Sequence, residues 1–143
     1  MTLEDIQNLW SEDCHIDRTA LDAESLKIPS LHQKYYKHYL REYYKLKKEE
    51  GDYNDLKRLK HEYYTGKLSQ KELNDLGWEP FQFILKGELP LYLDSDKELS
   101  EILIRIEMQK EKVKYLESII KSLKDRNFLI KNAIEFIKFS NGA

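Results

Sequence analysis

The feature of this sequence that most restricts its fold is a seven-residue repeat of apolar positions in the C-terminal third. Two interleaved series carry the repeat, and Gln109 is their only polar member. Such a pattern is typical of a helix that packs against other helices along a narrow seam. The series are Leu99, Ile106, Val113 and Ile120, and Ile102, Gln109, Leu116 and Leu123. We therefore expect a long coiled-coil-like helix, which a capping box at Ser95 and Glu98 would start.

The composition extends this expectation to the rest of the chain. Of the 143 residues, 35% are charged, but only 5 are Gly and 3 are Pro, which disfavours a turn-rich β-sandwich or barrel. Because 41% of the residues are hydrophobic, the chain can bury a core and should fold. The sequence predicts an all-α fold in which long helices form a hairpin-like arrangement with one short extended segment.

Compartment and membrane association follow from what the sequence lacks. It contains no apolar run of about 18 residues, and its N-terminus has neither the basic flank nor the apolar stretch of a signal peptide. The single Cys14 cannot form an internal disulfide, which fits a reducing compartment. We expect a cytoplasmic protein that has no membrane partner.

The first 29 residues combine a short helix with an acidic arm. Thr2 and Asp5 resemble a capping box and predict a helix to about Trp10. Residues 11–29 have a weak pattern, and the whole segment 1–29 carries a net charge of −5. The following segments 30–71, 72–98 and 99–143 carry +5, −5 and +3. A polyanionic partner is therefore expected to meet residues 30–71.

Residues 30–71 predict a long helix that begins at Pro29, where a first helical turn tolerates proline. One stripe of this helix is apolar and aromatic, and a neighbouring stripe is basic. The apolar stripe consists of Leu31, Tyr35, Tyr39, Tyr43 and Leu46, and the basic stripe of Lys34, Lys37, Arg41, Lys45 and Lys48. Gly51 and Asp52 predict a bend or a brief interruption. Gly66 is placed to cap the end, and Ser69 and Glu72 predict a further short helix to about Leu76.

The helical pattern stops between residues 77 and 94. Two Gly and two Pro residues punctuate the short apolar runs Phe81–Leu85 and Leu89–Leu93. A small hairpin and an extended strap across helices are both compatible with this segment.

The chain ends in a segment that is apolar around most of its circumference. After an interruption at Asp125-Arg126-Asn127, a last short helix is expected over Phe128–Phe139. We expect this helix and the heptad seam to build a homo-oligomer, so that residues 95–143 form an oligomerisation region and residues 1–94 a DNA-binding region. The predicted oligomerisation residues are Leu99, Ile102, Ile106, Val113, Leu116, Ile120, Leu123, Phe128, Ile130, Ile134 and Ile137.

Cations, tyrosines and a predicted helix end meet within residues 56–67. Binding of a single strand needs cations for the phosphates and flat aromatic rings for unpaired bases, and both are present here. The alternative is that the cations only solvate a helix whose tyrosines pack inside. Candidate DNA-binding residues are Lys57, Arg58, Lys60, His61, Tyr63, Tyr64 and Lys67, together with the basic stripe.

Several motifs, taken in order along the chain, resemble the UvsY family of recombination mediators of T4-like bacteriophages. They are Leu3-Glu4-Asp5-Ile6-Gln7 with Ile16-Asp17, the basic residues leading into Tyr63-Tyr64-Thr65-Gly66-Lys67, Ser95-Asp96-Lys97-Glu98, and Asp125-Arg126-Asn127 before Phe128-Leu129-Ile130-Lys131. Each motif is weak alone, but the ordered set spans nearly the whole chain. Residues 81–93 depart from the more polar segment expected there.

The resemblance implies a non-enzymatic protein that binds single-stranded DNA and forms a ring-like homo-oligomer, a hexamer or heptamer, through its C-terminal part. It also implies two protein partners, a RecA-like phage recombinase and the phage single-strand-binding protein, which the mediator helps the recombinase to displace. By position, the family's DNA-binding cations fall on Arg58 and Lys60, with Arg and Lys exchanged relative to the best-known member. Arg and Lys contact phosphate with different geometry, so the resemblance implies the role of these two positions and not their affinity for DNA.

Other kinds of site find little support. The four histidines and Cys14 do not show a metal-ligand spacing, the carboxylates are dispersed among lysines, and no P-loop or Ser or Cys nucleophile motif occurs. We expect no metal, no cofactor and no enzymatic activity, so that ATP hydrolysis would belong to a partner. The alternative function is a helical oligomeric adaptor whose basic stripe has no DNA role.

Overall fold

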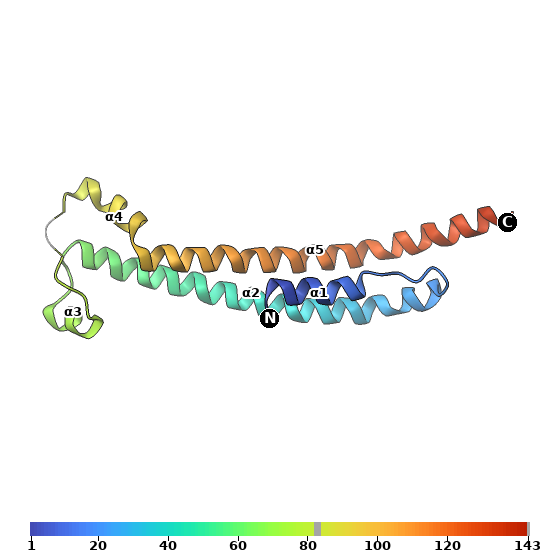
Figure 1. Cartoon of the computed structure of the whole chain (residues 1–143), viewed down its shortest axis with the longest axis horizontal. Helices are drawn as coiled ribbons and strands as arrows, with labels where there is room; N and C mark the ends of the chain where they lie inside the picture. Colours follow the sequence, from blue (N-terminus) through green and yellow to red (C-terminus); the bar gives the residue numbers. More distant parts are fainter. Residues whose placement is uncertain (82–83, 143) are drawn as a thin grey trace. The chain divides into compact units, whose positions relative to one another are not determined.

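The computed structural model describes residues 1–81 and 84–142, and its regular structure is helical (Figure 1). Among these residues there is no strand. The elements are α1 (Leu3–Asp13), α2 (Leu21–Tyr64), α3 (Gln70–Leu76), the 3-10 turn η1 (Lys86–Glu88), α4 (Leu89–Ser95) and α5 (Lys97–Ser140). The all-α prediction is confirmed.

Helices α2 and α5 each run for 44 residues without the interruptions that the sequence suggested. Helix α2 begins at Leu21, so Pro29 lies inside it, and it continues through Gly51. Helix α5 likewise continues through Asp125-Arg126-Asn127, so residues 128–139 are not a separate helix. An internal Pro or Gly costs a helix about 1 to 3 kcal/mol, which the tertiary packing of a long amphipathic helix can offset.

The chain divides into two compact units. Unit 1 comprises Met1–Tyr44 and Gln109–Ala143, and unit 2 comprises Lys45–Met108. This division by packing cuts across the functional division at residue 94 that we expect from the sequence. The functional division therefore has to be judged by binding experiments, not by packing.

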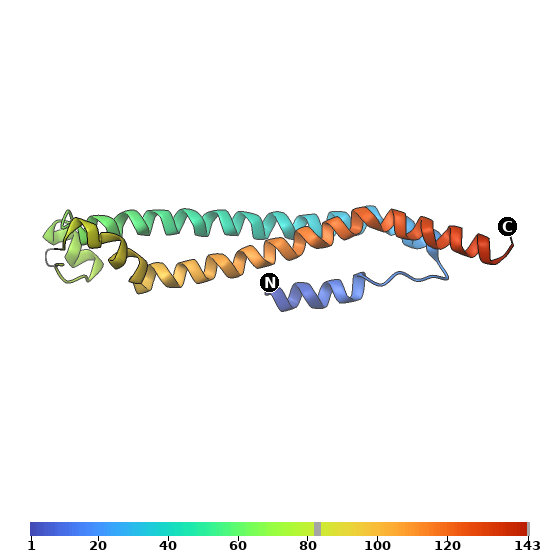
Figure 2. The same cartoon turned by 90° about the horizontal axis from the view of Figure 1, so that it is seen from above.

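Unit 1 packs around a core to which α1, α2 and α5 contribute. Figure 2 shows the course of these helices. The buried members of this core are Ile6, Tyr35, Leu116, Ile119, Ile120 and Leu123. The heptad positions Leu116, Ile120 and Leu123 of α5 are thus covered by this chain's own helices. The one polar member of the seam, Gln109, donates from Nε2 to the Glu42 carbonyl oxygen at 2.8 Å and to Glu42 Oε2 at 2.7 Å. Its amide is therefore satisfied within the same chain.

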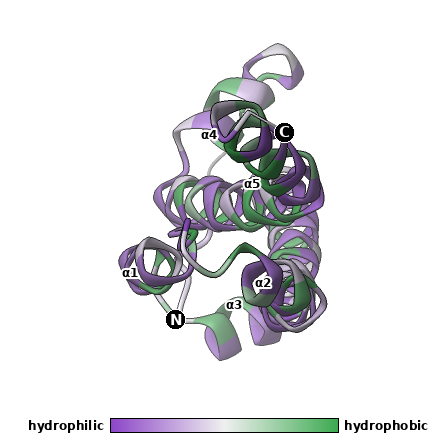
Figure 3. Cartoon of the chain, turned by 90° about the vertical axis from the view of Figure 1, so that its right-hand side faces the viewer, coloured by the Kyte–Doolittle hydropathy of each residue, from purple (hydrophilic) through white to green (hydrophobic). Residues whose placement is uncertain are grey.

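The C-terminal part of α5 keeps the apolar character that the sequence indicated, and Figure 3 shows hydrophobic residues towards the C terminus. Only Ile130 of the apolar side chains beyond residue 127 is buried among the described residues. The exposed ones are Phe128, Leu129, Ile134, Phe136, Ile137 and Phe139. These six side chains belong to unit 1, but its other residues do not cover them.

Three of the predicted helix caps form, and one is displaced by a residue. Thr2 and Asp5 make the expected capping box, and the Ser69 hydroxyl accepts from the Glu72 backbone N–H at 3.2 Å. Gly66 ends α2 at a φ of +72°, which glycine adopts without strain. The predicted box at Ser95 is wrong, because the Ser95 hydroxyl donates to the Leu91 carbonyl oxygen inside α4. Asp96 takes its place and accepts from the Leu99 N–H at 3.0 Å.

Unit 2 contains residues 77–94, for which the sequence is compatible with a hairpin or an extended strap. Residues 78–81, 84 and 85 have no regular structure, and Gln82 and Phe83 of the first apolar run lie outside the described residues. The second run, Leu89–Leu93, is helical within α4, with Pro90 in its first turn. A hairpin is therefore wrong for this run, since proline suits a first helical turn and removes a donor that a strand would use.

Candidate nucleic-acid interface

The end of α2 carries the Tyr-Tyr-Thr-Gly segment on a well-defined helix terminus. The Lys67 N–H donates to the Glu62 carbonyl oxygen at 2.9 Å, and the Gly66 N–H donates to the Tyr63 carbonyl oxygen at 3.1 Å. These two bonds form a Schellman motif, which satisfies carbonyl groups that a helix end leaves unpaired. The motif directs Lys67 away from α2, and its side chain is exposed.

Tyr63 and Tyr64 belong to an aromatic cluster within unit 2. The Tyr63 ring lies 5.0 Å from Trp78, and the Tyr64 ring lies 4.9 Å from Phe81 and 5.8 Å from Tyr92, as centroid distances. The Tyr63 hydroxyl donates to the Glu79 carbonyl oxygen at 2.7 Å. Both rings are thus engaged in intramolecular packing, as the alternative interpretation of this motif expected.

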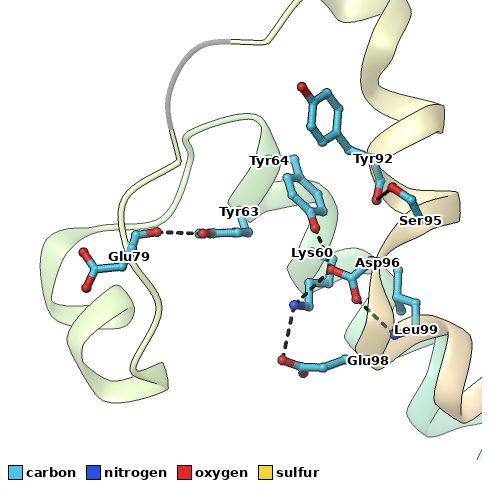
Figure 4. A network of polar contacts seen from close by, with 9 residues as sticks. All are labelled: Lys60, Tyr63, Tyr64, Glu79, Tyr92, Ser95, Asp96, Glu98 and Leu99. Carbon is cyan, nitrogen blue, oxygen red and sulfur yellow. Dashed lines mark hydrogen bonds and ion pairs between the residues drawn. The ribbon is translucent and has the colours of Figure 1, made fainter.

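Lys60 is buried, and Figure 4 shows its ammonium joined to the carboxylates of Asp96 and Glu98. Its Nζ is 3.1 Å from Asp96 Oδ2, 3.4 Å from Glu98 Oε1 and 4.2 Å from the centroid of the Trp78 ring. The two carboxylates and the ring supply the interactions that a buried ammonium needs. In this arrangement Lys60 does not present its charge to solvent.

The same network fixes the charge of Asp96. Burial alone would raise the pKa of Asp96, but hydrogen bonds from the Tyr64 hydroxyl, the Leu99 N–H and Lys60 lower it below its ordinary value. The Tyr64 hydroxyl donates to Asp96 Oδ2 at 2.6 Å, and the pKa of Tyr64 is raised by burial and by this bond. Asp96 is therefore an anion that joins α5 to the end of α2.

The other predicted cations near the helix end are exposed. Arg58 has 83% of its side chain accessible, with its Nε 3.5 Å from Glu62 Oε1. Lys57, His61 and Lys67 are also exposed. Of the residues predicted here, Arg58, Lys57, His61 and Lys67 are therefore accessible from solvent, whereas Lys60 is held by Asp96 and Glu98.

The basic stripe lies nearer the N-terminal end of α2, and most of it is open to solvent. Lys37, Arg41, Lys45 and Lys48 are exposed. Lys34 differs, because its Nζ lies 2.6 Å from Asp13 Oδ2 and joins α2 to the end of α1. Burial would raise the pKa of Asp13, but hydrogen bonds from Lys34 and Tyr35 hold it below its ordinary value. Lys34 is thus a structural cation in unit 1.

The apolar stripe predicted on α2 supplies core residues, and a different aromatic row faces solvent. Tyr35 and Leu46 are buried, whereas Tyr36 and Tyr44 are 43% and 68% exposed. Tyr36 and Tyr44 flank Leu40 at intervals of four residues. The sequence-based prediction does not include Tyr36 and Tyr44, although their spacing of four residues from Leu40 is a signal that could identify them. The row Tyr36, Leu40 and Tyr44 therefore places exposed aromatic rings on the same helix as the basic stripe.

The predicted oligomerisation residues fall into two groups in the structure. Leu99, Ile106, Val113, Leu116, Ile120, Leu123 and Ile130 are buried within the chain. Ile102 is half-buried, and Phe128, Ile134 and Ile137 are exposed. Only the second group has surface available for contact with another copy in this conformation.

The described part of the chain shows neither the residue cluster of a metal site nor a helix suited to span a membrane. Within residues 1–81 and 84–142, no three His, Cys, Asp or Glu side chains are grouped as a metal site requires. In the same residues, no helix combines the length and apolarity that crossing a bilayer demands.

Comparison with known proteins identifies the family of this chain. The family model described as "Recombination, repair and ssDNA binding protein UvsY" matches residues 9–143. The chain belongs to the UvsY family. The resemblance seen in the sequence motifs is thereby confirmed. A search of curated proteins gives no match.

Solved UvsY structures share the fold. Three crystal structures of the bacteriophage T4 recombination mediator protein UvsY match with TM-scores of 0.84, 0.83 and 0.81 at 21%, 20% and 20% identity. The matches cover 99%, 97% and 95% of this chain and 98%, 99% and 98% of the T4 chains. The all-helical architecture described above is therefore the UvsY fold.

Proposed function

We propose that this protein is a recombination mediator that binds single-stranded DNA and helps a RecA-like phage recombinase to load onto DNA coated by a single-strand-binding protein. Membership of a family described by recombination, repair and ssDNA binding supports the proposal. The observation that carries it is a set of exposed cations on α2 in a chain whose net charge is −2. These cations are Lys37, Arg41, Lys45, Lys48, Lys57 and Arg58.

Exposed cations on a helix favour binding to the phosphate backbone without sequence preference. Each Lys or Arg that neutralises a phosphate releases counterions, so affinity falls as salt rises. We infer that Lys37, Arg41 and Arg58 contact phosphates directly. Lys60 would not contact DNA itself. It would support the interface indirectly, since its contacts hold Tyr64 and Asp96 beside the end of α2.

The mediator has to change which protein occupies the strand. We infer that it is not an enzyme and that ATP hydrolysis belongs to the recombinase. Mediation then works by differential affinity, because a ligand shifts an equilibrium only by its difference in affinity for the two states. A strand held at several cationic sites would be kept in a conformation that the recombinase accepts and the coating protein does not.

Several linked copies of this cationic surface require a homo-oligomer. We propose that the exposed apolar end of α5 supplies the contacts between copies. Phe128, Ile134 and Ile137 keep this role from our sequence-based prediction, and Phe136 and Phe139 extend it, at 61% and 80% exposure. A ring-like assembly would raise affinity through effective concentration. The acidic segments 1–29 and 72–98 remain for contacts with partner proteins.

The test measures the nucleation lag of the cognate recombinase on single strands coated with the single-strand-binding protein. Addition of this protein should shorten the lag, and Lys37→Ala with Arg41→Ala should remove most of the effect while the native mass of the assembly is unchanged. An equal lag with and without the intact protein, at several salt concentrations, would favour the alternative of an adaptor without a DNA role.

A further inference from the structure

Two neighbouring rows of side chains lie on the part of α2 that belongs to unit 1. One row, Tyr36, Leu40 and Tyr44, is apolar and aromatic. The other row begins with Lys37 and Arg41, and both of these cations are exposed. Positions four residues apart form a continuous ridge on a helix, and the two rows differ by one residue, so they are adjacent ridges.

The aromatic row faces away from the core. Tyr35 points into the core and is fully buried, whereas Tyr44 is 68% exposed. At 3.6 residues per turn, Tyr44, Lys37 and Arg41 fall within an arc of roughly 60°, and Tyr35 lies nearly opposite Tyr44. The exposure of Tyr44 therefore follows from its helical position in unit 1.

The exposed rings are supported by other aromatic side chains. Tyr36 stacks on His32 with centroids 5.7 Å apart and an interplanar angle of 11°, and it lies 5.7 Å from Tyr39. The series continues through Tyr43 to Tyr44, with centroid separations of 5.8 Å and 6.4 Å. Tyr39 also packs against the core of unit 1. Contacts of this kind limit ring motion, so the rings are partly ordered before a ligand arrives.

We propose that these two rows form a track for single-stranded nucleic acid, in which Tyr44 and Tyr36 stack on unpaired bases while Lys37 and Arg41 hold the adjoining phosphates. The chemistry matches both parts of such a ligand, since every base has a flat face and every phosphate is anionic. Tyr36 and Tyr44 are eight residues apart, which is about 12 Å along a helix, so they would contact different nucleotides of one strand.

The track deepens the proposed function and rests on it, because it assigns the preference for single strands to particular rings. A duplex hides the faces of its bases and would use only the cationic row. The tyrosines of the Tyr-Tyr-Thr-Gly segment are less suited to this role, since Tyr63 and Tyr64 are half-buried and their hydroxyls are bonded to Glu79 and Asp96.

The experiment compares binding of the full chain to two probes, a thymidine oligomer and an abasic deoxyribose-phosphate oligomer of equal length. Tyr44→Ala should weaken binding to the thymidine oligomer by about 5- to 160-fold, the fold-change that corresponds to loss of one stacked base. Binding to the abasic oligomer and the salt dependence should not change. Tyr44→Phe keeps the ring and should bind both probes like the wild type.

Lys37→Ala with Arg41→Ala gives the complementary result. It should weaken binding to both oligomers alike and flatten the log-log salt slope by ~0.7 for each phosphate that is no longer neutralised. Equal losses on both probes for Tyr44→Ala, no loss on either, or a changed native mass of the assembly would overturn the track. If the wild type binds neither oligomer at physiological salt, the proposed function itself fails.

Discussion

The ammonium of Lys60 lies 3.1 Å from the carboxylate of Asp96, and both side chains are almost completely buried in unit 2. The cation was expected, from the resemblance to the UvsY family, to bind DNA together with Arg58. The structure instead gives the two residues different surroundings, because Arg58 has 83% of its side chain in solvent. Substitution of each residue should therefore affect a different measurement.

Lys60→Ala should lower the free energy of unfolding, whereas Arg58→Ala should not. Removal of one partner from a buried ion pair leaves the other charge without compensation, which typically costs about 3 to 5 kcal/mol. Arg58→Ala should instead flatten the salt dependence of single-strand binding by ~0.7 in log-log slope. Thermal or urea unfolding, followed by circular dichroism, and a salt titration distinguish the two effects.

The matched control is Lys57→Ala, which removes an exposed cation one helical turn away. Its unfolding curve should coincide with that of the wild type. A Lys60→Ala variant of unchanged stability that loses DNA binding would show that Lys60 leaves its buried position to contact the strand.

Asp96 should make the stability of the protein depend on pH in the acid range. Its folded-state pKa is lowered below the ordinary value of 3.8, so its contribution is complete above about pH 4 and is lost as the pH falls through the folded value. Asp96→Asn keeps a capping side chain but removes the charge. The variant should be less stable than the wild type at pH 7, and the difference should shrink below about pH 4.

Asp94→Asn provides the control, because Asp94 is exposed two residues earlier. Its stability should follow that of the wild type across the whole range. A constant gap between Asp96→Asn and the wild type at every pH would contradict the charged role of Asp96.

The contact between Gln109 and Glu42 yields a test of the seam. Gln109→Leu should lower the free energy of unfolding by about 1 to 3 kcal/mol, because Glu42 is buried and would lose the donor to its carboxylate. The double variant with Glu42→Leu should recover most of this loss, since apolar replacement of both partners is often neutral. Urea titrations of the single and double variants measure the coupling; additive losses would argue against a direct interaction.

Much of the fold could be predicted from the sequence, because helix ends and apolar periods are local signals. Thr2, Ser69 and Gly66 marked helix termini by side-chain and backbone chemistry that involves only a few neighbouring residues. The continuity of α2 through Pro29 could not be predicted in this way. It depends on packing of a 44-residue helix, which a local rule for proline does not include.

The residue types of the candidate site could be predicted from the sequence, but which individual residues are exposed to a ligand could not. The sequence identifies cations and tyrosines on one helix, yet exposure decides which of them can meet a strand. Lys60 and Arg58 look equivalent in sequence and differ only because Asp96 and Trp78 come from distant positions to bury Lys60. The heptad seam shows the same limit, since a period of seven does not say whether the partner helix belongs to the same chain or to another copy.

Assembly should depend on the exposed apolar end of α5. We expect Phe136→Ser with Phe139→Ser to reduce the native mass of the protein while leaving its helix content and stability nearly unchanged, because both side chains are largely exposed within the chain. At about 25 cal/mol per Å², each buried phenylalanine would supply a few kcal/mol to an interface. Native mass spectrometry or sedimentation measures the loss of subunits.

Substitution tests this interface better than removal of the helix. A chain that ends at Asp94 would lose Leu116 and Leu123, which are fully buried in unit 1, so misfolding and loss of assembly could not be separated. Lys138→Ala, between the two phenylalanines in sequence, is the matched control and should assemble normally. If the Phe136 and Phe139 variant keeps the native mass of the wild type, the contacts between copies lie elsewhere. If it instead becomes monomeric and binds single strands more weakly at equal chain concentration, avidity from linked sites accounts for the loss.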